Sequence, residues 1–75
     1  MNCLVCGTNA EQISITIEAV SIACPVCGEY DVSSWAIATS LMKKLEPEQR
    51  RDALHKAKRS ARPGVRPMID IYLFA

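Results

Sequence analysis

The sequence predicts a small α+β domain, with a three-stranded sheet followed by two helices. Three observations lead to this class. Four cysteines form two pairs of identical spacing within the first 28 residues, and isoleucines alternate with polar residues between the pairs. Beyond residue 32, apolar residues recur at three- and four-residue steps, as in amphipathic helices. At 75 residues, the chain lies in the size range where a hydrophobic core alone is marginal, so a further stabilising element is expected.

The cysteine pairs are Cys3-Leu-Val-Cys6-Gly7 and Cys24-Pro-Val-Cys27-Gly28. Two thiolates separated by two residues can hold one ion from a tight turn, and the following glycine supplies a permissive backbone. The pattern predicts a tetrahedral Zn²⁺ site with Cys3, Cys6, Cys24 and Cys27 as ligands. Two disulfides or a thiol redox pair are the alternatives. A redox site needs only one such pair, in a larger domain, so the duplicated spacing favours zinc.

The sequence shows no secretory signal and no apolar run long enough to cross a membrane. We therefore expect a cytoplasmic protein without membrane contact. Thiols stay reduced in that compartment, which favours metal ligation over disulfide bonding.

The segment between the cysteine pairs predicts a hairpin. Residues 13–17 alternate isoleucine with serine and threonine, which fits a strand buried on one face. Residues 20–22 repeat the pattern and continue into Cys24, with the turn expected at Glu18 and Ala19. Residues 29–32 are expected to form the third strand.

The first helix is expected to begin at Ser33 or Ser34, whose side chains can cap it. Its predicted apolar face, expected to cover the sheet with Trp35 and Leu41 against the isoleucines, consists of Trp35, Ala38, Leu41, Met42 and Leu45. We expect most of the aromatic side chains to be partly buried, because a small domain has few large ones.

Pro47 and Glu48 predict the start of a second helix, which is expected to reach about Ala61. Its apolar stripe is thin and consists of Ala53, Leu54, Ala57 and Ala61. Pro63 should end the helix, because proline disfavours helical geometry at the residue before it.

The order of cysteine turn, hairpin, cysteine turn and strand resembles that of zinc-ribbon proteins, and the segment from Cys24 to Tyr30 is similar to their second knuckle. The layout is also similar to small zinc-ribbon modules of uncharacterised bacterial and phage proteins. The resemblance implies a structural metal and no assigned activity. It divides a single domain of residues 1–75 into a ribbon (1–32), two helices (33–62) and a C-terminal tail or strand (63–75).

Charge is distributed unevenly along the chain. Residues 1–42 have a net charge of −4, whereas residues 43–75 carry nine basic and four acidic residues, a net charge of +5. This asymmetry predicts a basic surface that contacts DNA or RNA. Its expected residues are Arg50, Arg51, Lys58, Arg59, Arg62 and Arg66. The alternatives are a merely solvated helix face and a protein-interaction adaptor without nucleic-acid contact.

Enzymatic activity is not expected, because four thiolates leave a zinc ion no open coordination position. The one histidine, His55, is interpreted as a solvated side chain. The C-terminal segment, residues 68–75, is apolar enough to pack on the domain. Alternatively, Ile69, Ile71 and Leu73 form an edge strand that pairs with a protein partner or a second copy.

Overall fold

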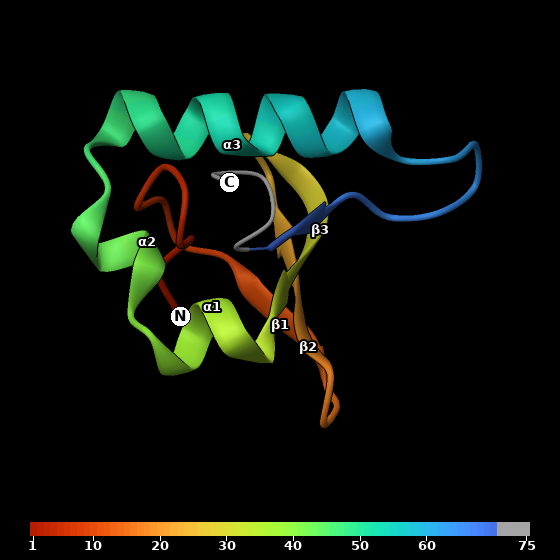
Figure 1. The fold of residues 1–75 in the computed structure, drawn as a ribbon, viewed down its shortest axis with the longest axis horizontal. Coiled ribbons are helices and arrows are strands. Elements are labelled where there is room, and N and C mark those ends of the chain that lie inside the picture. Colours follow the sequence, from red (N-terminus) through yellow and green to blue (C-terminus); the bar gives the residue numbers. More distant parts are fainter. Residues whose placement is uncertain (71–75) are drawn as a thin grey trace.

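The computed structural model describes residues 1–70 of the chain. In chain order the elements are β1 (Glu11–Ile15), β2 (Ala19–Cys24), β3 (Gly28–Ser33), α1 (Ser34–Ala38), α2 (Leu41–Lys44), α3 (Pro47–Ser60) and β4 (Met68–Ile69) (Figure 1). The predicted class, a small α+β fold, is confirmed. The second and third strands lie within one or two residues of their predicted bounds, and a short fourth strand is added.

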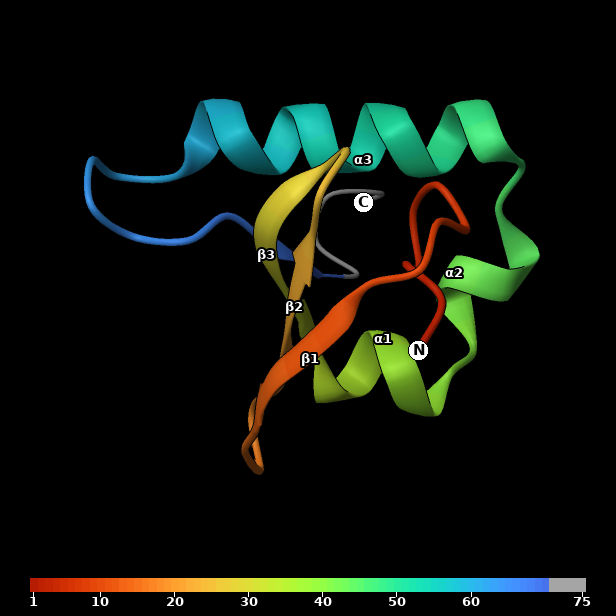
Figure 2. The same ribbon diagram turned by 180° about the vertical axis from the view of Figure 1, so that it is seen from behind.

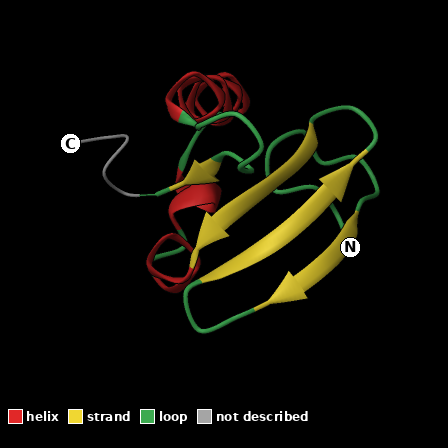
Figure 3. Ribbon diagram, turned by 90° about the vertical axis from the view of Figure 1, so that its right-hand side faces the viewer, coloured by secondary structure: helices red, strands yellow, loops and turns green. Residues whose placement is uncertain are grey.

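The sheet has the strand order β1-β2-β3-β4 (Figure 3). The first three strands are antiparallel neighbours, and the second cysteine pair forms the turn between β2 and β3. Strand β4 pairs with β3 in parallel, with Val32 opposite Ile69. A parallel pair requires a long crossover connection, which the three helices provide here.

The core lies between the sheet, the N-terminal cysteine loop and the helices. Helix α3 runs along one side of this loop, and α1 and α2 lie on its other side (Figures 1 and 2). The largest fully buried side chains are those of Val5, Ile22, Tyr30, Val32 and Ile69. These side chains and the buried cysteines Cys3, Cys24 and Cys27 belong to one hydrophobic core.

The burial predicted for the first strand is wrong. Ile13, Ile15 and Ile17 are exposed, and Ile17 keeps 95% of its surface. Strand β1 begins and ends two residues earlier than expected, and its pairing with β2 contains a bulge between Gln12 and Ser14. The bulge interrupts the alternation of faces, and α1 and α3 pack on β3 and β4 rather than on this outer strand.

The prediction of a single first helix is also wrong, because this segment forms two short helices, α1 and α2. Ser40 separates α1 from α2 and adopts a left-handed backbone with φ of 55°. Trp35 is 68% exposed and does not cover the sheet, whereas Ala36 and Met42 are buried. Leu41 and Leu45 pack partly against the core. The predicted cap is confirmed, since the Ser33 hydroxyl accepts a hydrogen bond of 3.2 Å from the backbone N–H of Ala36.

The predicted second helix is confirmed as α3. Its buried side chains are Ala53, Leu54 and Ala57, as the thin apolar stripe indicated. At its start, the Gln49 side chain accepts a hydrogen bond of 2.8 Å from the backbone N–H of Glu46, which satisfies one donor at the helix end. None of the helices within residues 1–70 has the length and apolar content that crossing a membrane requires.

The C-terminal segment is described as far as Asp70. The Ile69 side chain is fully buried, so this part of the segment packs on its own domain. Strand β4 is the last in the sheet order, and pairing of its outer edge with a partner or a second copy stays a prediction. Ile71 and Leu73, predicted with Ile69, lie outside the described residues.

Candidate metal centre and basic surface

The fold brings the four cysteines together. Their Sγ atoms all lie within 4.8 Å of one another, with Cys3 to Cys27 at 3.9 Å and Cys6 to Cys24 at 3.5 Å. Four sulfurs at about 2.3 Å from a tetrahedral ion would be about 3.8 Å apart. The four cysteines are free, and these separations far exceed a disulfide bond of about 2.05 Å. The sulfurs are therefore positioned to bind one metal ion.

The two cysteine turns have the same local structure. In each, the first sulfur accepts a backbone N–H from two residues ahead, Val5 to Cys3 and Val26 to Cys24, both at 3.4 Å. The glycine after each pair has a positive φ, 79° at Gly7 and 85° at Gly28, which a residue with a Cβ rarely adopts. The repeated sequence thus folds into two equivalent knuckles that face each other across the sulfurs.

The sulfurs differ in their access to solvent. Cys3, Cys24 and Cys27 are buried, whereas Cys6 is exposed. Hydrogen bonds from the side chain and backbone of Thr8 lower the pKa of Cys6 to about 6. Burial raises the pKa of Cys27 far above the usual thiol range. A coordinated divalent cation would deprotonate both thiols. Without a metal ion, ionising the buried Cys27 thiol is unfavourable. The positive charge of a bound metal ion would stabilise the Cys27 thiolate.

Tyr30 connects the sheet to the cysteine cluster. It is fully buried, and its hydroxyl oxygen lies 3.0 Å from the Cys3 sulfur. The same oxygen accepts a hydrogen bond of 3.1 Å from the backbone N–H of Leu4. Burial raises the pKa of Tyr30, so its proton is retained and is free to be donated to Cys3. The sequence predicted Tyr30 in the third strand and at the end of the second knuckle, but not its contact with Cys3; its position three residues after Cys27 is the signal that could have indicated this contact.

Lys58 connects helix α3 to the second knuckle. Its ammonium group donates a hydrogen bond of 3.0 Å to the backbone carbonyl oxygen of Cys27. A tetrathiolate centre with one divalent ion carries a net charge of −2, so a cation held beside a ligand is electrostatically favourable. This role was not expected, because Lys58 was counted among the nucleic-acid contacts.

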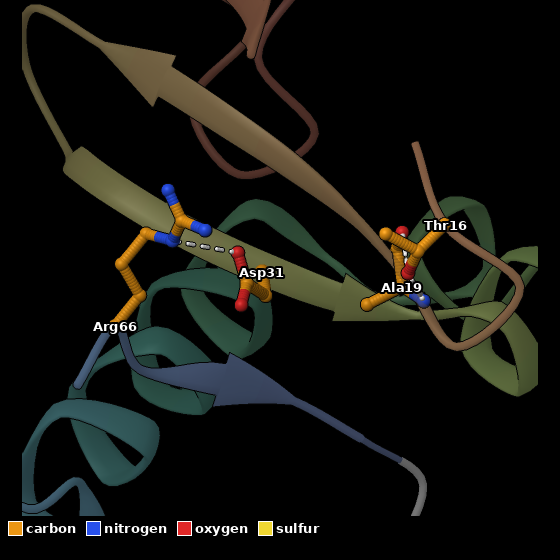
Figure 4. Close-up of polar contacts among 4 residues, drawn as sticks. All are labelled: Thr16, Ala19, Asp31 and Arg66. Atoms are coloured by element: carbon orange, nitrogen blue, oxygen red, sulfur yellow. Dashed lines mark hydrogen bonds and ion pairs between the residues drawn. The ribbon is translucent and has the colours of Figure 1, made fainter. Parts of the chain in front are cut away.

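The six residues predicted for a basic surface have different environments. Three of them face their own chain. Arg66 forms an ion pair of 3.2 Å with Asp31 on β3 (Figure 4), Arg50 is partly buried, and Lys58 is bonded as described. The other three, Arg51, Arg59 and Arg62, are exposed and make no ion pair within residues 1–70.

His55 is exposed on α3 and is not among the residues of the sulfur cluster. It lies four residues from both Arg51 and Arg59, so these three side chains share one stripe of the helix. The buried Ala53, Leu54 and Ala57 occupy the other side. This stripe, with Arg62 just beyond the helix end, is the exposed basic surface, and we call it the α3 basic stripe.

Comparisons with protein-family models, with curated proteins and with solved structures found no match for this chain. The resemblance to zinc-ribbon proteins therefore depends on the cysteine spacing and on the arrangement of knuckles and strands.

Proposed function

We propose that this chain is a non-enzymatic zinc-ribbon protein, in which Zn²⁺ joins the two knuckles and the α3 basic stripe contacts DNA or RNA. The observation that carries the proposal is the convergence of four Sγ atoms within 4.8 Å of one another. Tetrahedral sites with four sulfur ligands favour zinc or iron, and structural zinc sites have this closed form. A closed site supports a structural role, because no position is left for a substrate or a reactive water.

The metal is tested by elemental analysis of protein purified under reducing conditions. We expect one zinc ion per chain and four thiols that react with a thiol reagent only after zinc is released. If iron is found instead of zinc, the protein will be coloured and the site is assigned to iron. Protein that is folded without any metal would refute the structural-zinc proposal. A reducing compartment such as the cytoplasm would keep the four thiols available for the ion.

The nucleic-acid part of the proposal is supported by the α3 basic stripe. Arg51, His55 and Arg59 project from the side of α3 opposite its buried residues, so a phosphate backbone could approach them without displacing the core. Exposed aromatic residues are not part of the stripe, which favours contact with phosphates over stacking on bases. Binding would accordingly show little sequence preference.

The test is a titration of the zinc-loaded protein into labelled double- and single-stranded oligonucleotides at two salt concentrations. Binding through about three cationic side chains predicts a shallow salt slope of roughly −2 to −3 in log affinity against log salt. Absence of binding at the lower salt concentration would rule out the nucleic-acid proposal.

A protein-interaction adaptor is the second candidate function. It is favoured by the exposed apolar side chains at the hairpin end, Ile17 and Trp35, which a solitary small domain has little reason to expose. Under this candidate, nucleic acid leaves the backbone amide spectrum unchanged, and charge reversal on α3 has no effect on partner binding.

A further inference from the structure

The four cysteines differ in how easily their sulfurs can detach from a bound ion. Cys3, Cys24 and Cys27 are buried, and only Cys6 is exposed. A buried thiolate that detaches from the ion leaves an unpaired charge in the core, which is strongly unfavourable. The Cys6 thiolate can detach into water and be hydrated. We therefore expect Cys6 to be the first ligand to detach.

The surroundings of the sulfurs reinforce this difference. The Cys3 sulfur lies 3.0 Å from the buried Tyr30 hydroxyl, and the Cys24 sulfur accepts the backbone N–H of Val26 at 3.4 Å. Residues 6–9, which begin with the fourth cysteine, are all exposed. A small oxidant can thus reach that sulfur without any opening of the core.

A second thiol lies close enough to Cys6 to complete an oxidation. The Sγ atoms of Cys6 and Cys24 are 3.5 Å apart, so they need to approach by only about 1.5 Å to reach the length of a disulfide bond. These two cysteines belong to different knuckles, so a disulfide between them removes one ligand from each. Only Cys3 and Cys27 then remain, and two thiolates do not complete a closed tetrahedral site.

We propose that Cys6 is the site at which a peroxide oxidises this protein, and that Cys24 completes the reaction by forming a disulfide that releases the metal ion. The inference rests on the zinc site of the proposed function and concerns its regulation. It makes the zinc-bound state of the domain dependent on the concentration of peroxide.

The reaction has two steps. The detached Cys6 thiolate attacks one oxygen of the peroxide, the O–O bond breaks, and Cys6 becomes a sulfenic acid while hydroxide leaves. The Cys24 thiolate then attacks the Cys6 sulfur, the S–O bond breaks, and a second hydroxide leaves. The two sulfurs together lose two electrons, which the two peroxide oxygens gain.

The test uses the zinc-loaded full chain, whose zinc content is first measured in the reduced state. Hydrogen peroxide is added in the presence of a zinc-sensitive dye, and the remaining thiols are then alkylated. Proteolysis after Glu11 and Glu18 separates the two cysteine pairs, so a disulfide between the knuckles joins two peptides. We expect release of the zinc ion, a disulfide between Cys6 and Cys24, and alkylation of the other two cysteines only.

Histidine variants test the role of Cys6 independently. Cys6→His retains a zinc ligand at this position but removes the oxidisable sulfur. It should release zinc at least about tenfold more slowly than the wild type at the same peroxide concentration. The matched control is Cys3→His in the same knuckle, which keeps both reacting sulfurs and should release zinc at the wild-type rate. Mapping of the wild-type disulfide tests the proposal even if a variant fails to fold.

The outcomes separate this inference from the proposed function. Reduced protein that contains no metal would refute the zinc site itself, and the inference with it. Zinc-loaded protein that resists peroxide would overturn the inference alone. So would a disulfide that lacks Cys6, a disulfide within the first knuckle between Cys3 and Cys6, or equal rates of zinc release from Cys6→His and the wild type.

Discussion

The ammonium group of Lys58 lies 3.0 Å from the carbonyl oxygen of Cys27, and this hydrogen bond joins the last turn of the long helix to the second cysteine knuckle. The contact spans 31 residues of sequence. It fixes α3 at the cysteine cluster, and it places a positive charge beside a site whose four thiolates outweigh the charge of one divalent ion. The packing of the helix and the electrostatics of the metal site are therefore linked through one side chain.

Replacing Lys58 by methionine keeps most of the aliphatic side chain and removes the donor. We expect the free energy of unfolding to fall by about 1 kcal/mol, the usual contribution of one hydrogen bond. Denaturant titration at fixed excess zinc measures the change. The control is Lys56→Met on the same helix, where the lysine is exposed and makes no hydrogen bond within residues 1–70. Equal effects of the two variants would show that the Cys27 contact is not stabilising.

Removing the metal should unfold the domain. The binding free energy of a structural zinc site is on the order of 10 kcal/mol or more, which exceeds what a core of this size provides. A strong chelator under reducing conditions should collapse the amide dispersion in NMR spectra, and Cys27→Ser should act similarly. His55→Ala should not, because His55 is exposed and outside the sulfur cluster. Trp35 fluorescence is a poor measure of this transition, since that side chain is already exposed.

Preserved dispersion after complete removal of the metal would contradict this prediction. In that case hydrogen bonding and packing would be sufficient to keep the domain folded without a metal ion.

Local sequence rules predicted the features that depend on neighbouring residues. The knuckles follow from two cysteines and a glycine in each turn, and α3 follows from Pro47 and the thin apolar stripe around Leu54. The convergence of Cys3 with Cys27 could also be predicted, because a repeated ligand spacing is informative about contacts between distant segments.

Features that depend on tertiary arrangement could not be predicted in this way. The exposure of Ile13 results from a bulge and from helices that pack on other strands. The break at Ser40 has no strong signal in a segment whose apolar periodicity continues through it. Tyr30 and Lys58 acquire their contacts with the cysteine knuckles only when the sheet and α3 come together.

Reversing the charge of the α3 basic stripe should abolish nucleic-acid binding if that proposal is right. The variant is Arg51→Glu combined with Arg59→Glu and Arg62→Glu, and electrophoretic mobility shifts measure the binding. The control compares two double variants with the same change in net charge, Arg51→Glu with Arg59→Glu in the stripe and Lys43→Glu with Lys44→Glu in α2; the α2 variant should lose much less affinity, because its lysines are not part of the stripe. Equal losses would mean that net charge, and not the stripe, determines binding. Zinc content should be unchanged in both.

Tyr30→Phe removes one hydroxyl from a fully buried position beside Cys3. Groups that donate hydrogen bonds to metal ligands commonly change metal affinity by a factor of about 10–100 when they are lost. We expect a decrease in zinc affinity of that size, measured by competition with a chelator of known strength. The visible spectrum of the cobalt-substituted protein should retain its tetrahedral form, which distinguishes weaker binding from a lost ligand. Unchanged affinity would show that the hydroxyl only fills space.

Ser40→Gly should stabilise the domain. Ser40 holds a left-handed backbone with φ of 55°, a conformation that costs a residue with a Cβ about 1–2 kcal/mol. Glycine adopts it freely but loses roughly 0.5–1 kcal/mol through the greater freedom of the unfolded chain, so the expected gain is about 0.5 kcal/mol. Denaturant titration at fixed zinc measures the change. The matched control is Ala38→Gly in α1, which should destabilise by about 1 kcal/mol because its backbone is helical. If both glycines destabilise, the break between α1 and α2 is not held in the left-handed conformation in solution.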